Sequence, residues 1–386
     1  MLQGIDRLHK DNFRPIKGMK IGLLSNISCC DSELHPTISL FEKSKEIRLK
    51  AIFAPEHGFF CALQDQVKAS DSQYHGRLDI HSLYGPRRKP GLKTLDTLDA
   101  IVIDLPDIGT RYYTFLWSAM MMINKAATIH KKILILDRPN PLNGITVQGP
   151  MIDPGFESFV GLYSVPVRHG MTIGELCSML NREYNLEGDI EVIKAKGWQR
   201  STHYDEQNSL WTLPSPNMPC FSTAVVYPGM CLLEGTNVSE GRGTTKPFEM
   251  FGAPWIEPER LVQRLENSDI HGAAFRATYF MPAFHKYHGQ LCGGVQMYVT
   301  NRAQFAPVTA GLQIIKTIRN LYGNNFCWRQ PPYEFEEKKM PFDILIGNSW
   351  VRKAIENNAS VRTIEQQWQT GLTKFKRLRK KYLLYK

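Results

Sequence analysis

The chain has 386 residues, of which 42% are hydrophobic and 22% charged, a composition typical of a folded globular protein rather than a disordered or fibrous one. No segment reaches the roughly 18 apolar residues that a membrane-spanning helix requires. The net charge of +10 is concentrated near the C-terminus, and the length exceeds what one hydrophobic core usually supports, so we expect two domains.

The N-terminal part of the chain alternates short apolar runs with helical patterns, which predicts a parallel sheet covered by helices. The predicted strands are 19–26, 47–54, 98–105 and 131–137, and the predicted helices run from residue 37 to 46 and from 114 to 130. The turn after the first strand lacks a Gly-x-Gly-x-x-Gly pattern, and the sequence has no phosphate-binding loop. We therefore expect no dinucleotide or other cofactor.

Polar residues follow each predicted strand. The first strand ends at Asn26, and the second ends at Glu56 and His57 within Pro-Glu-His-Gly. The third leads into Asp104 and Asp107. In open α/β sheets the ligand crevice lies outside the carboxyl ends of the strands, which parallel strands bring to one edge. The strand ends therefore predict one site, to which Arg111 and Tyr112 also belong.

Structural roles are the alternative for some of these residues. Asn26 is as well suited to a turn or a helix cap as to ligand contact. Asp104 lies inside an apolar run, so its buried carboxylate needs a partner, for which Arg111 is the candidate. Glu56 and His57 favour function, because a helix cap would not require both.

From residue 159 the alternating rhythm fades and polar motifs become denser, which indicates a second domain. Arg168 and His169 come just before Thr172 and Glu175, whose spacing fits a capping box at the start of a helix. We therefore expect Glu175 to be structural. The expected domains are 1–158 and 159–386.

Two later loops carry further candidate site residues. The segment 214–219, Pro-Ser-Pro-Asn-Met-Pro, cannot form a helix or a central strand, and Asn217 is its expected hydrogen-bonding group. The next long loop holds Glu234, Glu240 and Arg242 among glycines, which let a backbone approach a ligand closely. The alternative is a flexible surface loop, but its apolar and aromatic residues favour a loop that packs on the protein.

The C-terminal segment 371–386 carries seven Lys and Arg residues and no acidic residue. Apolar residues recur at helical spacing from Leu372 to Tyr382, which predicts a terminal helix with one buried face and one solvated basic face. Contact with a membrane or a nucleic acid is the alternative. No nucleic-acid-binding motif supports it, so we expect no nucleic-acid partner.

The chemical inventory combines carboxylates, histidines, arginines and aromatic residues. The eight cysteines form no CxxC pair and no metal-ligand spacing, so we expect buried reduced thiols and no metal site. Paired carboxyl groups with aromatic platforms are the usual equipment for hydrolysing glycosidic bonds. Glu56, beside a proline and an apolar strand, is placed to have its pKa raised by desolvation. Arginines would suit a sugar that bears a carboxylate.

Several long motifs resemble one bacterial family. They are PEHG, DLPDIGTRYYT, LDRPNP, PVRHGMTIGEL, PSPNMP and EGTNVSEGRGTT, and the resemblance runs from about Gly22 to Tyr385. The family is that of the exo-β-N-acetylmuramidases, glycoside hydrolase family 171, first catalogued as domain of unknown function 1343. It implies a Rossmann-like N-terminal domain, a second α/β domain and an active-site cleft between them.

The resemblance also implies removal of N-acetylmuramic acid from the non-reducing ends of peptidoglycan fragments, so a small saccharide or muropeptide is the expected substrate. Glu56 is the expected general acid, assisted by His57, and Glu240 or Glu234 is the expected base or nucleophile, with Asp104 and Asp107 behind them. The residues expected to hold the sugar are Asn26, Arg111, Tyr112, Arg168, His169, Asn217 and Arg242.

Two other functions remain alternatives. One is a muropeptide-binding protein that uses the same cleft without cleavage, and the other is a metal-dependent hydrolase with His57, His169 and Asp104 as ligands. The chain departs from the family pattern at Cys61 and Asn143, where glycine is common, and at Pro106, where glutamine is common. The start lacks the apolar core of a signal peptide, which predicts a cytoplasmic protein unless the sequence begins too late.

Overall fold

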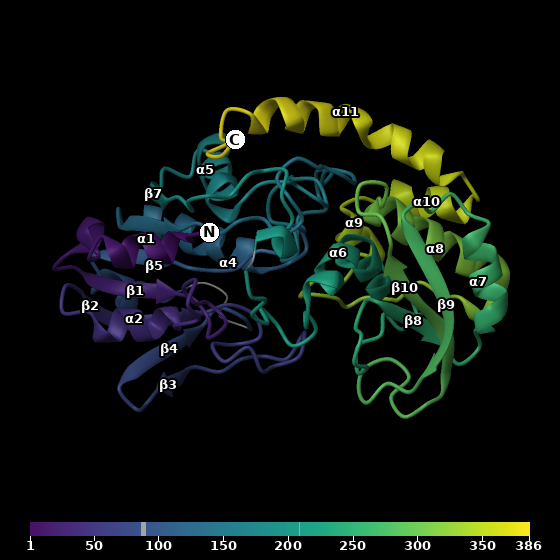
Figure 1. Cartoon of the computed structure of the whole chain (residues 1–386), viewed down its shortest axis with the longest axis horizontal. Coiled ribbons are helices and arrows are strands. Elements are labelled where there is room, and N and C mark those ends of the chain that lie inside the picture. The colour runs from purple at the N-terminus through teal and green to yellow at the C-terminus, as the bar shows by residue number, and fades with distance from the viewer. Residues whose placement is uncertain (86–89, 208) are drawn as a thin grey trace.

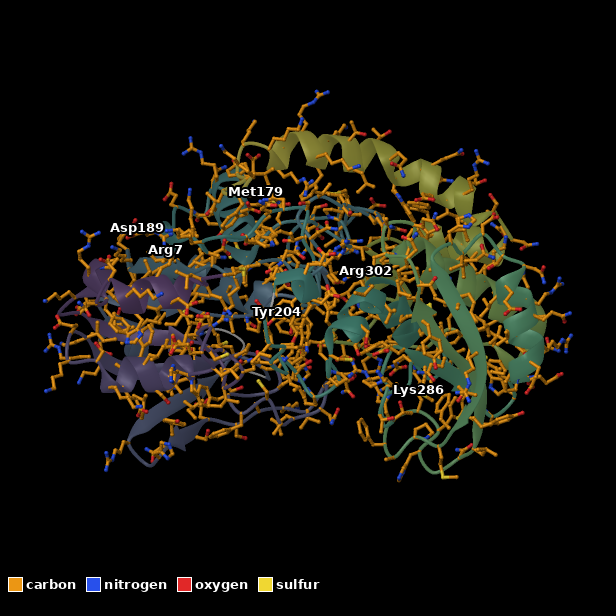
Figure 2. All side chains as sticks on the ribbon, viewed as in Figure 1. Arg7, Met179, Asp189, Tyr204, Lys286 and Arg302 are labelled. Atoms are coloured by element: carbon orange, nitrogen blue, oxygen red, sulfur yellow. The ribbon has the colours of Figure 1, made fainter. Side chains whose placement is uncertain are left out.

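The computed structural model describes residues 1–85, 90–207 and 209–386, and it contains two α/β units. Figure 1 shows the N-terminal unit at the left, the C-terminal unit at the right, and the last helix, α11 (Val361–Arg379), arching over both. Contacts also cross between the units lower down, where Arg302 of the second unit forms ion pairs of 2.5 and 3.4 Å with Asp205 and Glu206, close to Tyr204 (Figure 2).

The first unit is built on a seven-stranded sheet in the order β3-β4-β2-β1-β5-β6-β7. All neighbours pair in parallel except β3, which is antiparallel to β4. The four strands expected from the sequence are confirmed as β1, β2, β5 and β6. The strand bounds are β1 Lys20–Leu24, β2 Arg48–Ala54, β3 Ser72–Tyr74, β4 Leu78–Ser82, β5 Ala100–Ile103, β6 Lys132–Leu136 and β7 Asp189–Ile193.

Helices cover both faces of this sheet, as expected for a parallel sheet whose strands are apolar on both sides. The interior strand β5 is entirely buried, and Trp117 of α4 is completely buried in the core. The two helices expected from the sequence are confirmed as α2 and α4. The helix bounds in this unit are α1 Gly4–Lys10, α2 Thr37–Lys43, α3 Leu92–Asp96, α4 Phe115–Ala127 and α5 Ile173–Glu183.

The expected boundary between residues 158 and 159 falls inside the polypeptide that builds the first unit. Helix α5 and strand β7 both follow that point, and β7 pairs in parallel with β6 along its whole length. The change of rhythm near residue 159 reflects a long irregular crossover from β6 to α5 rather than a new domain. The capping box at the start of α5 is confirmed, with Thr172 accepting from the backbone of Glu175.

The second unit contains a three-stranded antiparallel sheet in the order β8-β10-β9, packed against helices. Helices α6 and α8 approach closely at Gly229, where a Cβ would lie 1.9 Å from the carbonyl oxygen of Pro307. This contact fixes the end of α6, from which the chain enters the 3-10 helix Cys231–Gly235. The remaining bounds are β8 Met250–Ala253, β9 Ala273–Phe280, β10 Cys292–Val299, α6 Phe221–Met230, α7 Pro258–Glu266, α8 Pro307–Tyr322, α9 Pro341–Ile346 and α10 Trp350–Glu356.

The predicted C-terminal helix is confirmed, but α11 is longer than expected and spans Val361–Arg379. Leu372 and Phe375 are buried as predicted. The basic face is only partly solvated, because Arg379 is buried and donates to the carbonyl oxygens of Gly144, His169 and Gly170 in the first unit. The C-terminus therefore ties the two units together.

Two other expectations concern the whole chain. The eight cysteines are all free, and five of them are buried, which agrees with the prediction of mostly buried thiols. None of the helices in the described ranges is long and apolar enough to cross a membrane.

Candidate active site

A cavity lies between the two units, outside the carboxyl end of β2. It is lined by segments from both units that are far apart in the sequence. Four of its side chains are carboxyl groups, and five are tyrosine or phenylalanine rings. The lining residues are Glu56, His57, Asp65, Tyr112, Tyr113, Thr114, Val160, Ser215, Asn217, Met218, Tyr227, Cys231, Glu234, Arg242, Phe248, Tyr333 and Glu334.

Glu56 is brought into the cavity by a sharp turn at the end of β2. Pro55 ends the strand, and His57 and Gly58 follow with left-handed φ angles of 69° and 72°. A left-handed φ angle is uncommon for a residue other than glycine, so tertiary contacts must hold this turn. Glu56 is only 5% exposed, and its Oε2 accepts a 2.6 Å hydrogen bond from Thr114 Oγ1. Thr114 is the N-cap residue of α4, and a helix N-terminus favours a nearby negative charge.

His57 has a defined tautomer. Its Nδ1 lies 2.8 Å from the carbonyl oxygen of Leu63, which can only accept, so Nδ1 carries a proton. In the neutral ring Nε2 is therefore the acceptor. The sequence places His57 beside Glu56, and the structure brings both into the same cavity wall.

Glu334 is a cavity carboxyl group that the sequence analysis missed. It comes from the irregular segment before α9, and both it and Phe335 have left-handed φ angles, of 46° and 67°. Its Oε2 accepts a 3.2 Å hydrogen bond from the hydroxyl of Tyr84. Burial raises the pKa of Glu334 well above its usual value, and the negative charges of Glu56 and Glu234 raise it further. No local motif marks this residue, although a glutamate between aromatic residues was a weak signal.

Tyr84 links the two carboxyl groups. Burial raises the pKa of its hydroxyl, and the negative charges of Glu56 and Glu334 raise it further, so the phenol keeps its proton as a donor. Glu56 and Glu334 are thus both buried and close enough to interact electrostatically. Two like charges at buried sites repel each other, which favours the protonated form of Glu334, the group whose pKa is raised.

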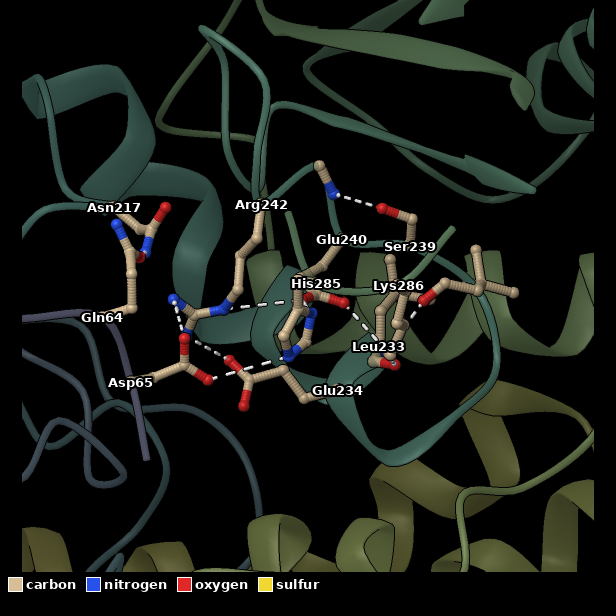
Figure 3. Close-up of polar contacts among 12 residues, drawn as sticks. Gln64, Asp65, Asn217, Leu233, Glu234, Ser239, Glu240, Arg242, His285 and Lys286 are labelled. Carbon is tan, nitrogen blue, oxygen red and sulfur yellow. Dashed lines mark hydrogen bonds and ion pairs between the residues drawn. The ribbon is translucent and has the colours of Figure 1, made fainter. Parts of the chain in front are cut away.

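Arg242 stands at the centre of an ion-pair network beside the cavity (Figure 3). Its guanidinium lies 3.2 Å from Asp65, 2.8 Å from Glu234 and 3.4 Å from Glu240. Because all three carboxylates surround it, its positive charge is fully offset within the protein. The pKa of Asp65 is lowered, since the charges of Arg242 and His285 outweigh the opposing effect of burial.

The two expected partners of Glu56 are both engaged in this network. Glu240 is completely buried, contacts Lys286 at 2.8 Å and His285 at 3.1 Å, and is not among the lining residues. Burial alone would raise the pKa of Glu240. The positive charges of Lys286 and His285 outweigh burial and hold that pKa below its usual value. Glu234 does line the cavity, but Arg242 and the hydroxyl of Tyr333, at 2.7 Å, occupy its two oxygens.

Asn217 and Tyr112 also line the cavity, as the sequence analysis expected for residues of the site. Asn217 donates a 2.6 Å hydrogen bond to Oε1 of Gln64, a contact seen at the left of Figure 3. The hydroxyl of Tyr112 donates to the carbonyl oxygen of Pro228 inside α6. The stiff proline-rich loop thus brings an amide from the middle of the chain to the end of β2.

Asn26 and Asp104 lie outside the cavity lining. Asn26 forms a turn, with its Oδ1 accepting from the backbone and hydroxyl of Ser28. Asp104 is completely buried and is bound by Arg138 at 2.6 and 2.8 Å and by the hydroxyl of Thr37 at 2.6 Å. The expectation that Arg111 would neutralise Asp104 is therefore wrong, because Arg138, just after the end of β6, supplies the guanidinium instead.

Arg111 and Arg168 are buried away from the cavity lining. The Arg111 guanidinium donates to three carbonyl oxygens, those of Pro150, Val165 and Leu345, and Arg168 donates to that of Leu142. Burial lowers the pKa of each arginine to about 10. Both side chains tie loops together within the protein.

His169 and Asp107 form a separate buried pair, with His169 Nε2 lying 3.3 Å from an Asp107 oxygen. Asp107 also lines a second cavity of about 320 Å³, together with Asp31 and Arg138. This second cavity lies outside β1, β5 and β6. The strand ends therefore share one edge, as expected, but they line two cavities rather than one. Within the described ranges no three His, Cys, Asp or Glu side chains are grouped so as to hold a metal ion.

Two departures from the family pattern have a backbone reason. Cys61 and Asn143, which stand where glycine is common, have left-handed φ angles of 54° and 71°. Glycine adopts this conformation at no steric cost, and other residues do so less easily. Cys61 and Asn143 therefore occupy turns that glycine would adopt more easily.

Comparisons with known proteins agree with this architecture. The family models described as "Exo-beta-N-acetylmuramidase NamZ, N-terminal" and "Exo-beta-N-acetylmuramidase NamZ, C-terminal" match residues 21–222 and 225–385. The chain is 41% identical to the peptidoglycan β-N-acetylmuramidase NamZ of Bacillus subtilis (strain 168), over 99% of this chain and 91% of that protein.

Two crystal structures of DUF1343 family proteins from Bacteroides fragilis NCTC 9343 have the same fold. The first has a TM-score of 0.88 and 30% identity, and the second has a TM-score of 0.77 and 29% identity. Each comparison covers 100% of this chain and 99% of the other. The chain therefore belongs to the exo-β-N-acetylmuramidase NamZ family, a family of glycoside hydrolases.

Proposed function

We propose that the chain removes N-acetylmuramic acid from the non-reducing ends of peptidoglycan fragments, with Glu56 and Glu334 as its two catalytic carboxyl groups. The observation that supports this most directly is the meeting of these two buried carboxyl groups, from different units, in one cavity. Glycoside hydrolysis requires such a pair on either side of the bond that is cleaved. The B. subtilis relative is named for this substrate.

The environments of Glu56 and Glu334 indicate which of them is the general acid. Glu334 is the group that keeps its proton, because burial and the neighbouring charges disfavour its ionised form. It therefore acts as the general acid that protonates the oxygen of the leaving sugar. Glu56, which accepts from Thr114 at the N-terminus of α4, is the group that acts on the anomeric side. This division reverses the role that the sequence suggested for Glu56.

The other lining residues have supporting roles in this proposal. His57 presents Nε2 as an acceptor, and Asn217 presents an amide, so both suit the hydroxyl and acetamido groups of the sugar. Glu234 stays paired with Arg242 and positions the guanidinium rather than reacting. The substrate is a fragment whose non-reducing end fits between the two units.

The test compares Glu56→Gln and Glu334→Gln on two substrates, 4-nitrophenyl β-N-acetylmuramide and the natural disaccharide with N-acetylglucosamine as the leaving sugar. A nitrophenolate leaves without protonation, so Glu334→Gln should lose at least about 100-fold on the disaccharide and much less on the nitrophenyl glycoside. Glu56→Gln should lose at least about 100-fold on both.

Each other outcome has a distinct meaning. The opposite pattern of losses would assign the acid role to Glu56. Loss of neither activity would remove both residues from the mechanism. Wild-type protein that binds the sugar but never cleaves it would identify a muropeptide-binding protein instead. Proton NMR of the first product released would show whether Glu56 attacks the anomeric carbon directly, with retention, or activates water, with inversion.

A further inference from the structure

The charges of the cavity pose a problem for an anionic substrate. Four carboxyl groups line it, and the arginine that lines it, Arg242, is already surrounded by three carboxylates at 2.8 to 3.4 Å. A sugar that carries its own carboxylate would be repelled from such a cavity unless another cation met it. Arg111 and Arg168, the other arginines suggested by the sequence, donate to carbonyl oxygens elsewhere.

Arg329 lies beside the cavity, next to its lining residues rather than among them. Its guanidinium stacks over the ring of Tyr333 at 5.2 Å, and Tyr333 is itself a lining residue whose hydroxyl binds Glu234. One terminal nitrogen of Arg329 donates a 3.3 Å hydrogen bond to Gln66, the residue after the lining carboxylate Asp65. Arg329 therefore contacts Tyr333, which binds Glu234, and Gln66, which is next to Asp65 in the sequence. It forms no ion pair with either carboxyl group.

The backbone around Arg329 is held in place. Its N–H donates a 2.9 Å hydrogen bond to the carbonyl oxygen of Gly235, and Trp328 forms a β-bridge with Thr236. Both contacts fix Arg329 against the short helix that carries Glu234. These contacts thus hold the backbone of Arg329 in place, and stacking on the ring of Tyr333 orients the plane of its guanidinium.

The chemistry of this guanidinium fits a carboxylate ligand. Arg329 is half-buried and forms no ion pair with any residue in the described parts of the chain. Only one of its five N–H donors has a side-chain or backbone partner there, so an edge of the planar fork remains for a bidentate contact. Stacking on an aromatic ring orients the fork, which a lysine could not reproduce.

We propose that Arg329 receives the lactyl carboxylate of N-acetylmuramic acid and thereby sets the specificity of the site. The inference rests on the proposed function, since it assigns one group of that substrate to one side chain. It explains how a cavity lined by four carboxyl groups can bind an anionic sugar. It also means that a sugar whose lactyl group is amidated, as by a stem peptide, is a poorer substrate than the free acid.

The experiment measures kcat and KM for 4-nitrophenyl β-N-acetylmuramide and for the same glycoside with its lactyl carboxylate converted to the amide. The variants are Arg329→Gln and Arg329→Lys. Arg260→Gln is the matched control, because Arg260 also lies over a tyrosine ring, at 6.0 Å from Tyr322, but is far more exposed and is paired with Glu257.

We expect Arg329→Gln to raise KM for the acid about 10- to 100-fold, the range that corresponds to a lost charge-assisted hydrogen bond. KM for the amide and kcat for both substrates should change less than about 3-fold, and Arg329→Lys should be intermediate. Equal losses on acid and amide, or no preference of the wild type for the acid, would overturn the proposal.

A binding measurement separates this inference from the proposed function. Calorimetric titration with free N-acetylmuramic acid and with its lactyl amide needs no turnover. Weaker binding of the acid alone in Arg329→Gln supports the role of Arg329 even if the wild type never cleaves the glycoside. Unchanged binding of the acid overturns that role even if the wild type is an active muramidase.

Discussion

Removal of the Arg242 guanidinium should destabilise the protein severely at neutral pH. Arg242→Ala leaves Asp65, Glu234 and Glu240 facing one another without the charge that now lies 2.8 to 3.4 Å from each. Glu240 is completely buried and Glu234 is 4% exposed, so water cannot replace the guanidinium. His285 and Lys286 still offset part of the charge of Glu240.

The magnitude follows from the cost of breaking a buried ion pair on one side, which is about 3–5 kcal/mol. Because the free energy of unfolding of a domain is only about 5–15 kcal/mol, this loss would be a large part of it. Arg242→Lys keeps a charge but loses the fork geometry, so its loss should be smaller, about 1–2 kcal/mol. The exposed control Arg260→Ala should change stability by less than about 0.5 kcal/mol.

The loss should also depend on pH. The folded-state pKa values of Asp65 and Glu240 are lowered, so their pairing stabilises the fold above the unfolded-state pKa values, near 4, and is lost as the pH falls through the folded-state values. In Arg242→Ala the carboxyl groups take up protons more readily on acidification. The difference between wild type and variant should therefore shrink from pH 7 to pH 4.

Urea denaturation followed by circular dichroism at pH 7, 5.5 and 4 measures these differences, provided that the transition midpoints are compared at a common m value. A difference below about 1 kcal/mol at pH 7, or one that grows on acidification, would refute the electrostatic reasoning. The first result would mean that the carboxyl groups are already protonated in the native protein.

Three further outcomes are expected. Tyr84→Phe removes a hydrogen bond that lowers the pKa of Glu334, so the alkaline limb of the kcat profile should move to higher pH, and an unmoved limb would argue against Glu334 as the acid. Arg138→Met leaves the fully buried Asp104 without its bidentate partner and should cost about 3–5 kcal/mol in urea denaturation, whereas Arg138→Met combined with Asp104→Asn should recover part of that loss. Gly229→Ala places a Cβ 1.9 Å from a carbonyl oxygen at the start of α8 and should cost about 1–3 kcal/mol, seen as a lower thermal midpoint, and an unchanged midpoint would show that α6 and α8 can separate freely.

Local structure in this protein could be predicted from local sequence. The apolar runs that became β1, β2, β5 and β6 are buried on both faces, so their composition alone distinguishes them from exposed segments. The Thr172–Glu175 capping box involves residues three apart, and its hydrogen bonds form as the spacing predicts. The placement of Glu56 and His57 at the end of β2 likewise depends on one strand and one turn.

Partnerships between distant residues could not be predicted in this way. Asp104 needed a buried cation, but both Arg111 and Arg138 were available in the sequence, and only the packing of the next strand decided between them. Glu240 and Glu234 occupy the same loop, yet the positions of Lys286 and Tyr333 make one a buried anchor and leave the other in the cavity.

The composition of the site shows the same limit. By itself the sequence determined the parallel sheet, the family and the carboxylate at the end of β2, because these depend on patterns carried by short stretches of chain. Only the tertiary structure brought Glu334 into the same cavity as Glu56 and placed Arg329 over the ring of Tyr333. Both residues lie in an irregular segment whose position is fixed by contacts with the other unit and with Gly235. Burial and neighbouring charges decide whether a carboxyl group is protonated and whether an arginine is available to a ligand. Both depend on long-range contacts and leave no signature in the local sequence.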